Sequence, residues 1–236
     1  LMPNPALFRW AMVLGQLAKP FAALLPTTSP DPGGATFWRR LRAMLDAVPK
    51  RLAPPSPVDR PQTFVAHGTR TQRVALMNGC GQQVLAPEVN EATVRLLTRH
   101  GVEVVIAEGA GCCGSSVLHT GQREAARDLA RGNIASWIDE LDGPLDAIIA
   151  NASGCGTTLK DYGHLLAEDP QWRGGAEIVA KLARDVTEVL APNVLRPVGR
   201  PVREDGSPVV IAYHAACSMQ HGQKLTEPPK ALLRAA

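Results

Sequence analysis

The sequence predicts an α/β fold, in which helices cover a parallel sheet of the Rossmann or flavodoxin-like type. From residue 73 onward, short apolar runs alternate with longer amphipathic stretches, and this alternation is typical of repeated strand–helix units. The first amphipathic stretch also carries helix-end signals, with Pro87 near its start and Gly101 just beyond its end. We therefore expect helices to alternate with the strands of one sheet.

The apolar runs are the predicted strands, and the amphipathic stretches between and after them are the predicted helices. The strands are residues 74–78, 102–108, 146–151 and 209–213. The helices are expected between Pro87 and Gly101 and at residues 122–141, 157–166 and 177–190.

The chain divides into three predicted regions. Residues 1–72 form a helical, Pro-rich, basic arm, residues 73–195 the α/β domain, and residues 196–236 a linker with the start of a second similar domain. Clustered prolines predict extended linkers at 26–32 and 49–61. Because the chain begins with Leu1 and a predicted helix is still running at Ala236, we expect an internal fragment.

Two helices are predicted in the arm. The second covers residues 37–48, and the first shows helical spacing of its apolar positions. Those positions are Leu7, Trp10, Leu14, Leu17 and Phe21.

Charge is concentrated in the arm. Residues 1–73 carry ten Lys and Arg against three Asp, a charge of +7, whereas the whole chain carries +3. Such an arm is suited to an acidic partner or to anionic lipid head groups, which makes peripheral contact with the inner face of the cytoplasmic membrane an expectation. Basic and aromatic residues do not interleave as in single-stranded nucleic-acid binders, so no nucleic-acid partner is expected.

Targeting signals and a transmembrane segment are not predicted. The most apolar stretch, residues 7–25, is interrupted by Arg9, Lys19 and Pro20, and it lacks a signal-peptide cleavage pattern. Five cysteines, two of them adjacent, do not resemble a secreted disulfide framework. We therefore expect a cytoplasmic, reducing environment.

The cysteines follow the predicted strands. Cys80 comes after the first strand, Cys112 and Cys113 after the second, Cys155 after the third and Cys217 after the fourth. The loops after parallel strands emerge at one edge of a sheet, where ligands bind. We therefore expect the first four thiols to converge as the ligands of one metal centre, with Cys217 as the first ligand of a second, truncated site.

Glycines surround these thiols, and among them Gly111, Gly114 and Gly154 are expected to let backbone N–H groups point at the sulfur atoms. Four thiolates in such a setting are typical of a [4Fe-4S] cluster. The side chains of adjacent Cys112 and Cys113 are expected to diverge toward two different irons.

Other kinds of site remain open. Zinc is usually held by cysteines two to four residues apart, but a zinc-stabilised structural or assembly module is the main alternative. Residues 109–114 also spell G-x-G-x-x-G, the pattern of dinucleotide sites, although no acidic residue ends a following strand as that pattern requires.

The cysteine motifs of this sequence resemble those of a known family. Cys80, then Cys112-Cys113-Gly114, then residues 152–156 resemble the cysteine-rich "CCG" domain, and residues 213–224 resemble the opening of a second copy. The arrangement is similar to the family of iron-sulfur subunits of glycolate oxidase (glycolate dehydrogenase). Related domains occur in lactate-utilisation proteins, anaerobic glycerol-3-phosphate dehydrogenase and heterodisulfide reductase.

The resemblance implies a role in electron transfer. In that family an FAD-containing subunit oxidises the 2-hydroxy acid, and the iron-sulfur subunit passes electrons toward a quinone-type acceptor without catalysing substrate chemistry itself. The N-terminal ferredoxin-like domain of the family is absent from this chain. Heterodisulfide-reductase-like thiol chemistry is a further alternative, but that enzyme has C-x-x-C where this chain has Ala152 and Cys155. An ordinary four-thiolate cluster is therefore what the resemblance implies.

Overall fold

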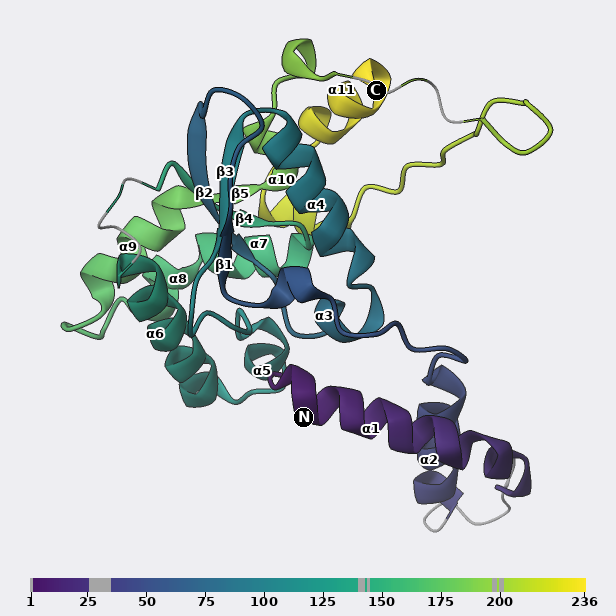
Figure 1. The fold of residues 1–236 in the computed structure, drawn as a ribbon. Coiled ribbons are helices and arrows are strands. Elements are labelled where there is room, and N and C mark those ends of the chain that lie inside the picture. The colour runs from purple at the N-terminus through teal and green to yellow at the C-terminus, as the bar shows by residue number, and fades with distance from the viewer. Residues whose placement is uncertain (1, 26–34, 140–142, 144, 197–198, 200–201) are drawn as a thin grey trace.

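The computed structural model describes residues 2–25, 35–139, 143, 145–196, 199 and 202–236. Within them an α/β domain carries a helical arm at its N-terminal side and a C-terminal segment that folds back onto the domain (Figure 1). The predicted linker at 26–32 lies outside the described residues. The predicted linker at 49–61 contains only one short 3-10 helix, η2 (Pro57–Asp59).

The domain is built on a five-stranded sheet with the order β1-β3-β2-β4-β5. Strands β2 to β5 are mutually parallel, and β1 pairs antiparallel with β3 at one edge. This confirms the predicted α/β class. The strands are β1 (Gln62–Phe64), β2 (Gln72–Met77), β3 (Val102–Ile106), β4 (Ala147–Ala150) and β5 (Ala183–Asp185).

Helices bury both faces of the sheet. In β2, Val74 and Leu76 pack with α4 (Glu88–Arg99), while Ala75 and Met77 point to the opposite face. This alternation in a run that is buried throughout is expected of a central parallel strand. The opposite face is covered by α6 (Arg123–Asp139), α7 (Ser153–Lys160), α8 (Tyr162–Leu165) and α9 (Arg173–Leu182).

The remaining helices outside the arm are short, and the last two belong to the C-terminal segment. They are α3 (Gln82–Leu85), α5 (Ser115–His119), α10 (Val186–Val189), η4 (Pro192–Val194), η5 (Ser218–Gly222) and α11 (Glu227–Ala235).

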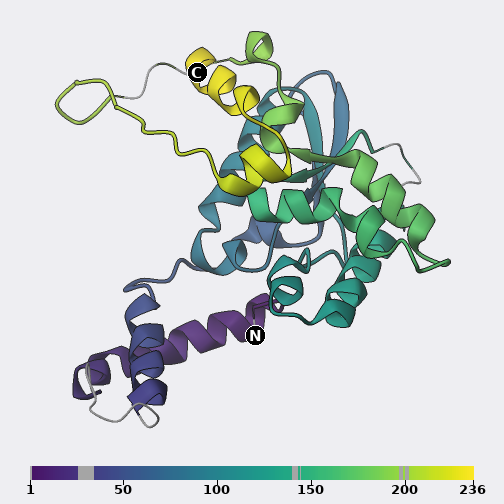
Figure 2. The same cartoon turned by 180° about the vertical axis from the view of Figure 1, so that it is seen from behind.

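The arm contains the two predicted helices, α1 (Pro5–Ala18) and α2 (Ala35–Ala47), with the 3-10 helix η1 (Lys19–Leu24) following α1. It projects away from the domain, as Figure 2 shows from behind. The α1 helix begins where Asn4 caps it, since the Asn4 side chain accepts a hydrogen bond from the Leu7 N–H. Among the described helices, none is long and apolar enough to cross a lipid bilayer.

The polar side of α1 contacts other segments of the same chain. Arg9 donates to the Gln83 carbonyl at 2.9 Å, and Gln16 donates to the Pro49 carbonyl at 3.1 Å. The apolar side is consequently exposed, and no residue of α1 is buried. The exposed apolar side chains of α1 and η1 are Leu7, Trp10, Leu14, Leu17, Phe21 and Leu24.

The predicted strand at 209–213 is wrong. The segment runs outside helix and strand, and Val210 and Ile211 are exposed. An apolar β-branched run becomes a strand only when a neighbouring strand pairs with its backbone. In the part of the chain that the structure describes, the nearest pairing is an isolated bridge between Val202 and Pro208.

The predicted helix at 177–190 is also wrong, because α9, strand β5 and α10 divide this stretch. Asp185 ends β5 and caps α10 in a capping box with Glu188, in which the Asp185 carboxylate accepts from the Thr187 N–H at 2.9 Å. The predicted helix at 157–166 is two helices, since α7 begins at Ser153 and α8 follows it.

Candidate metal centre

Four of the cysteines lie near the point of the sheet where the strand order reverses. The parallel strands follow the spatial order β3-β2-β4-β5, so the chain moves to one side after β2 and to the other from β4 onward. Ligands of open α/β sheets bind at the carboxyl edge near such a switch point. Cys80 follows β2, Cys112 and Cys113 follow β3, and Cys155 follows β4 at this edge.

The structure brings these four side chains together. The thiols influence one another's pKa values in pairs, namely Cys80 with Cys112, Cys112 with Cys113 and Cys113 with Cys155. The adjacent thiols of Cys112 and Cys113 shift each other's pKa values, and the divergence of these two side chains toward two irons stays a prediction. Both are buried, whereas Cys80 and Cys155 are partly exposed.

The four thiols form one electrostatically coupled group, because Cys155 is influenced by Cys113, Cys80 and Cys112. Among the described residues, no group of three or more His, Cys, Asp or Glu side chains is arranged as it would be around one metal ion. Cys217 is exposed at the start of η5, and like the other four it is a free thiol.

Cys155 lies in the first turn of α7, not in a loop before the helix as predicted. The position follows from Ala152, whose extended backbone is the N-cap, so that the helix starts at Ser153. The positive end of the helix dipole favours a thiolate there. The hydrogen bond from Cys113 lowers the pKa of the Cys155 thiol.

The other three thiols are held in the neutral form. The pKa of Cys80 is raised, first by its hydrogen bond to Cys112 and then by burial. The hydrogen bond with Cys113 raises the pKa of Cys112. For Cys113, the hydrogen bond from Cys112 lowers the pKa, but the bond with Cys155 and burial outweigh it and raise the pKa to about 12.

Backbone N–H groups are directed at the buried sulfur atoms. The Gly114 N–H lies 3.4 Å from the Cys112 Sγ, and the Ser115 N–H lies 3.5 Å from the Cys113 Sγ. Gly114 has φ +87°, and a Cβ there would lie 3.2 Å from the Ala126 carbonyl oxygen, so only glycine fits. Gly111 and Gly154 have open space around them, and their backbones do not require glycine.

Two buried side chains that the sequence analysis missed support the double-cysteine loop. Asn133 of α6 and Tyr162 of α8 hydrogen-bond the carbonyl oxygens of Cys112 and Cys113. A signal for Asn133 was present, because this polar residue interrupts the apolar face of the predicted helix at 122–141. Burial raises the pKa of Tyr162, which keeps the hydroxyl protonated.

A second hydrogen-bond network that the sequence analysis did not predict supports the loop that carries Cys80. The Gln82 amide donates to the Asn151 side chain at 2.8 Å, and Asn151 donates to the Asn90 side chain at 2.9 Å. Asn90, which is fully buried, donates to the Asn78 carbonyl at 2.9 Å. These side chains tie the loop after β2 to the end of β4, so that Cys80 is held beside the other thiols.

The C-terminal segment packs on the helix that carries Cys155. The Ser218 hydroxyl donates to the Ser153 hydroxyl at 2.7 Å, and the Gln223 amide donates to the Ser153 carbonyl at 3.0 Å. A Cβ at Gly156 would lie 2.7 Å from the Gln223 Nε2, so this glycine permits the close approach.

These groups fit a metal cluster with sulfur ligands. Thiols whose pKa values are raised by one another give up their protons when a cation binds between them. The N–H groups at the sulfur atoms and the positive end of α7 favour an anionic cluster.

The comparison with known families agrees with this donor set. Residues 74–160 match the CCG family of cysteine-rich domains. The chain thus contains a domain of the cysteine-rich CCG family, which confirms the predicted resemblance.

Two curated relatives are similar over most of the chain. The glycolate oxidase iron-sulfur subunit of Escherichia coli (strain K12) is 34% identical over 99% of this chain and 50% of its own length. The probable glycolate oxidase iron-sulfur subunit of Bacillus subtilis (strain 168) is 31% identical over 83% of the chain and 42% of its length.

Lactate utilization protein A of Shouchella clausii (strain KSM-K16) is 29% identical over 68% of the chain and 63% of its own length. The chain thus spans about half the length of the glycolate oxidase subunits that it matches. No solved structure matches the chain significantly.

Proposed function

We propose that this chain is the iron-sulfur electron-transfer part of a flavin-linked 2-hydroxy-acid dehydrogenase, with glycolate as the favoured substrate of the complex. The proposed ligands of one [4Fe-4S] cluster are Cys80, Cys112, Cys113 and Cys155. The observation that carries the proposal is the meeting of these four thiols from three strand ends at the switch point of the sheet. The names of the similar iron-sulfur subunits support it.

A bound cluster supplies one-electron transfer, and the protein supplies its surroundings. The buried Cys112 and Cys113 exclude water from one side, and the Gly114 and Ser115 N–H groups stabilise negative charge on sulfur. The partly exposed Cys80 and Cys155 lie on the side where a redox partner approaches. We assign no substrate chemistry to this chain.

The proposed partners follow from this role. An FAD-containing dehydrogenase subunit donates the electrons, and a quinone-type acceptor receives them. The complex is placed in the cytoplasm, at the inner face of the membrane. Residues 196–236 are proposed to open a second cysteine-rich domain, with Cys217 as its first metal ligand.

Membrane contact through the arm is part of the proposal, but the arm's charges and its apolar face play different roles. Arg9 and Lys19 are engaged by backbone carbonyls of the arm and the domain, whereas Arg39 and Arg40 are exposed on α2. The exposed apolar face of α1 and η1 suits the lipid interface, with the α2 arginines near anionic head groups.

Vesicle binding tests the membrane contact. The protein is expected to sediment with vesicles of phosphatidylcholine and phosphatidylglycerol, and Leu14→Asp with Leu17→Asp should abolish the binding. Val210→Asp, which changes an even more exposed apolar residue outside the arm, is the control. If the unaltered protein does not bind these vesicles, the membrane contact is wrong.

Metal analysis after anaerobic purification tests the cluster. We expect iron, acid-labile sulfide and broad absorption near about 400 nm, as iron-sulfur clusters give. Cys113→Ser should lose this absorption, and Cys217→Ser should retain it. Zinc in a colourless protein would instead establish the zinc-stabilised structural module.

The closeness of the four thiols, which shift one another's pKa values, also favours a second candidate, heterodisulfide-type thiol chemistry. Disulfide formation in the unaltered protein, together with absence of iron, would support that candidate.

A further inference from the structure

Two buried side chains hold both carbonyl groups of the double cysteine. Asn133 is 2% exposed and Tyr162 is 0% exposed. The Asn133 Nδ2 donates to the Cys112 carbonyl oxygen at 2.9 Å, and the Tyr162 hydroxyl donates to the Cys113 carbonyl oxygen at 3.0 Å.

The two side chains also hold each other. The Asn133 Nδ2 donates its second hydrogen to the Tyr162 hydroxyl oxygen at 3.0 Å, and the Asn133 Oδ1 accepts from the Gly111 N–H at 2.7 Å. Both hydrogens of the amide and the single hydrogen of the hydroxyl are therefore used. A buried network whose donors are all paired selects one arrangement of the backbone that it contacts.

The geometry of the peptide bond links these hydrogen bonds to the electrostatics around the cysteine sulfur atoms. In a planar trans peptide, the carbonyl and the following N–H point in opposite directions. When Tyr162 holds the Cys113 carbonyl toward the interior, the Gly114 N–H of the same peptide turns the other way, toward the Cys112 Sγ at 3.4 Å. Asn133 holds the carbonyl of the peptide between Cys112 and Cys113.

We propose that Asn133 and Tyr162 are positioning residues that set the reduction potential of the cluster by orienting the two peptides of the double cysteine. The inference rests on the proposed function, because it requires a cluster on these thiols. The carbonyl oxygens of both peptides are held by Asn133 and Tyr162, and the Gly114 N–H is turned to the Cys112 sulfur, which would favour the reduced, more negative form of a cluster bound there.

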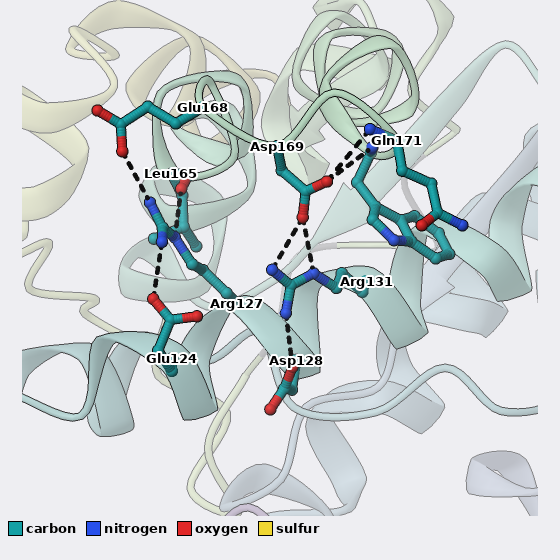
Figure 3. Close-up of polar contacts among 9 residues, drawn as sticks. Glu124, Arg127, Asp128, Arg131, Leu165, Glu168, Asp169 and Gln171 are labelled. Atoms are coloured by element: carbon teal, nitrogen blue, oxygen red, sulfur yellow. Dashed lines mark hydrogen bonds and ion pairs between the residues drawn. The ribbon is translucent and has the colours of Figure 1, made fainter.

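The pair is held independently of its own hydrogen bonds. Two arginines of α6 bind the last residue of α8 and the chain that follows it (Figure 3). Arg131 donates to Asp169 through two nitrogens, at 3.0 and 2.8 Å, and Arg127 donates to the Leu165 carbonyl at 3.0 Å. Removing the Tyr162 hydroxyl alone therefore leaves α6 and α8 in place, and the substitution tests orientation rather than folding.

Tyr162→Phe is the central variant, because it removes one hydroxyl and keeps the buried ring. Thr98→Val is the matched control, since it removes a buried hydroxyl that donates to the Val94 carbonyl at the far end of α4. Iron content, the electron paramagnetic resonance spectrum and a redox titration are measured on the full chain with its cluster.

We expect Tyr162→Phe to keep full iron content and to have a lower reduction potential than the unaltered protein. A tenfold weaker preference for the reduced form is the expected size, which is about 59 mV for a one-electron couple. Thr98→Val should keep the original potential and spectrum.

Each other outcome has a defined meaning. An unchanged potential in Tyr162→Phe with full iron content overturns the inference while leaving the proposed function intact. Absence of iron in the unaltered protein overturns the proposed function itself. If Tyr162→Phe does not fold, Asn133→Ser is titrated against the same control, and a lower or an unchanged potential decides the inference in the same way.

Discussion

The arm and the α/β domain use similar helices in opposite ways. In the domain, α4 turns its apolar residues Val94 and Leu97 onto the sheet. In the arm, α1 turns Arg9 and Gln16 onto its own chain and leaves its apolar side exposed. Apolar periodicity thus predicts a helix in both regions, but it does not reveal whether this chain itself covers the apolar side.

The largest expected difference between the two regions concerns their tryptophans. Trp137 of α6 is 1% exposed, and Trp10 of α1 is 67% exposed. Trp137→Ala should lower the free energy of unfolding by about 3–5 kcal/mol, because it leaves a cavity in the core. Trp10→Ala should change it by less than about 0.5 kcal/mol. Urea unfolding followed by circular dichroism measures both, and equal losses would mean that the arm's apolar face is covered in solution.

A smaller difference in stability is expected between substitutions of two glycines in the loop that carries Cys112 and Cys113. Gly114→Ala should cost about 1–3 kcal/mol of unfolding free energy, because alanine at φ +87° is strained and its Cβ presses on the Ala126 carbonyl. Gly111→Ala, where the space is open, is the matched control and should cost little. Thermal unfolding compares them. Similar melting temperatures for the two variants would contradict the assigned role of Gly114.

The ion pairs of the two regions should differ in their dependence on pH. Desolvation raises the pKa of Asp169, but hydrogen bonds from Arg131 and from the Trp172 and Gln171 N–H groups outweigh it and lower the pKa. The stability from Asp169 is therefore fully present above its unfolded pKa of about 3.9 and is lost as pH falls through the lower folded pKa.

Asp169→Asn should accordingly be less stable than the unaltered protein at pH 7, and the difference should shrink in acid. Asp46→Asn in the arm, which removes the exposed pair with Arg42, should change stability by less than about 0.5 kcal/mol. Thermal unfolding between neutral and acid pH measures both variants. A difference for Asp169→Asn that persists unchanged in acid would refute the assignment.

The smallest expected effect lies within the domain and concerns two cysteines of similar exposure. Cys80 and Cys155 are both partly exposed, but their pKa values shift in opposite directions. In the reduced, metal-free protein, Cys155 should form the thiolate at lower pH and react faster with iodoacetamide. Mass spectrometry of the alkylated peptides at neutral pH gives both rates. Faster alkylation of Cys80 would contradict the positions assigned to the two thiols.

The central strands β2, β3 and β4 could be predicted because each is a run of apolar residues buried on both faces. The edge strands could not. β5 is only Ala183–Asp185, and its central residue Arg184 is exposed, so pairing with β4 rather than composition makes it a strand. The capping box of Asp185 and Glu188 was readable in the sequence and would have ended the predicted helix.

The cysteines of the candidate centre could be predicted, since each follows an apolar run and glycines flank it. Asn133 and Tyr162 are different, because they lie 21 and 49 residues from the carbonyl groups that they bind. Their partners depend on how α6 and α8 pack on the sheet.

The sequence by itself determined the α/β class and the strands that Cys80, Cys112, Cys113 and Cys155 follow, because both depend on residues close together in the chain. Only the tertiary structure decided which thiols influence one another, which peptides face them and which side of α1 stays uncovered. Those features depend on contacts between distant segments, and local composition does not encode such contacts.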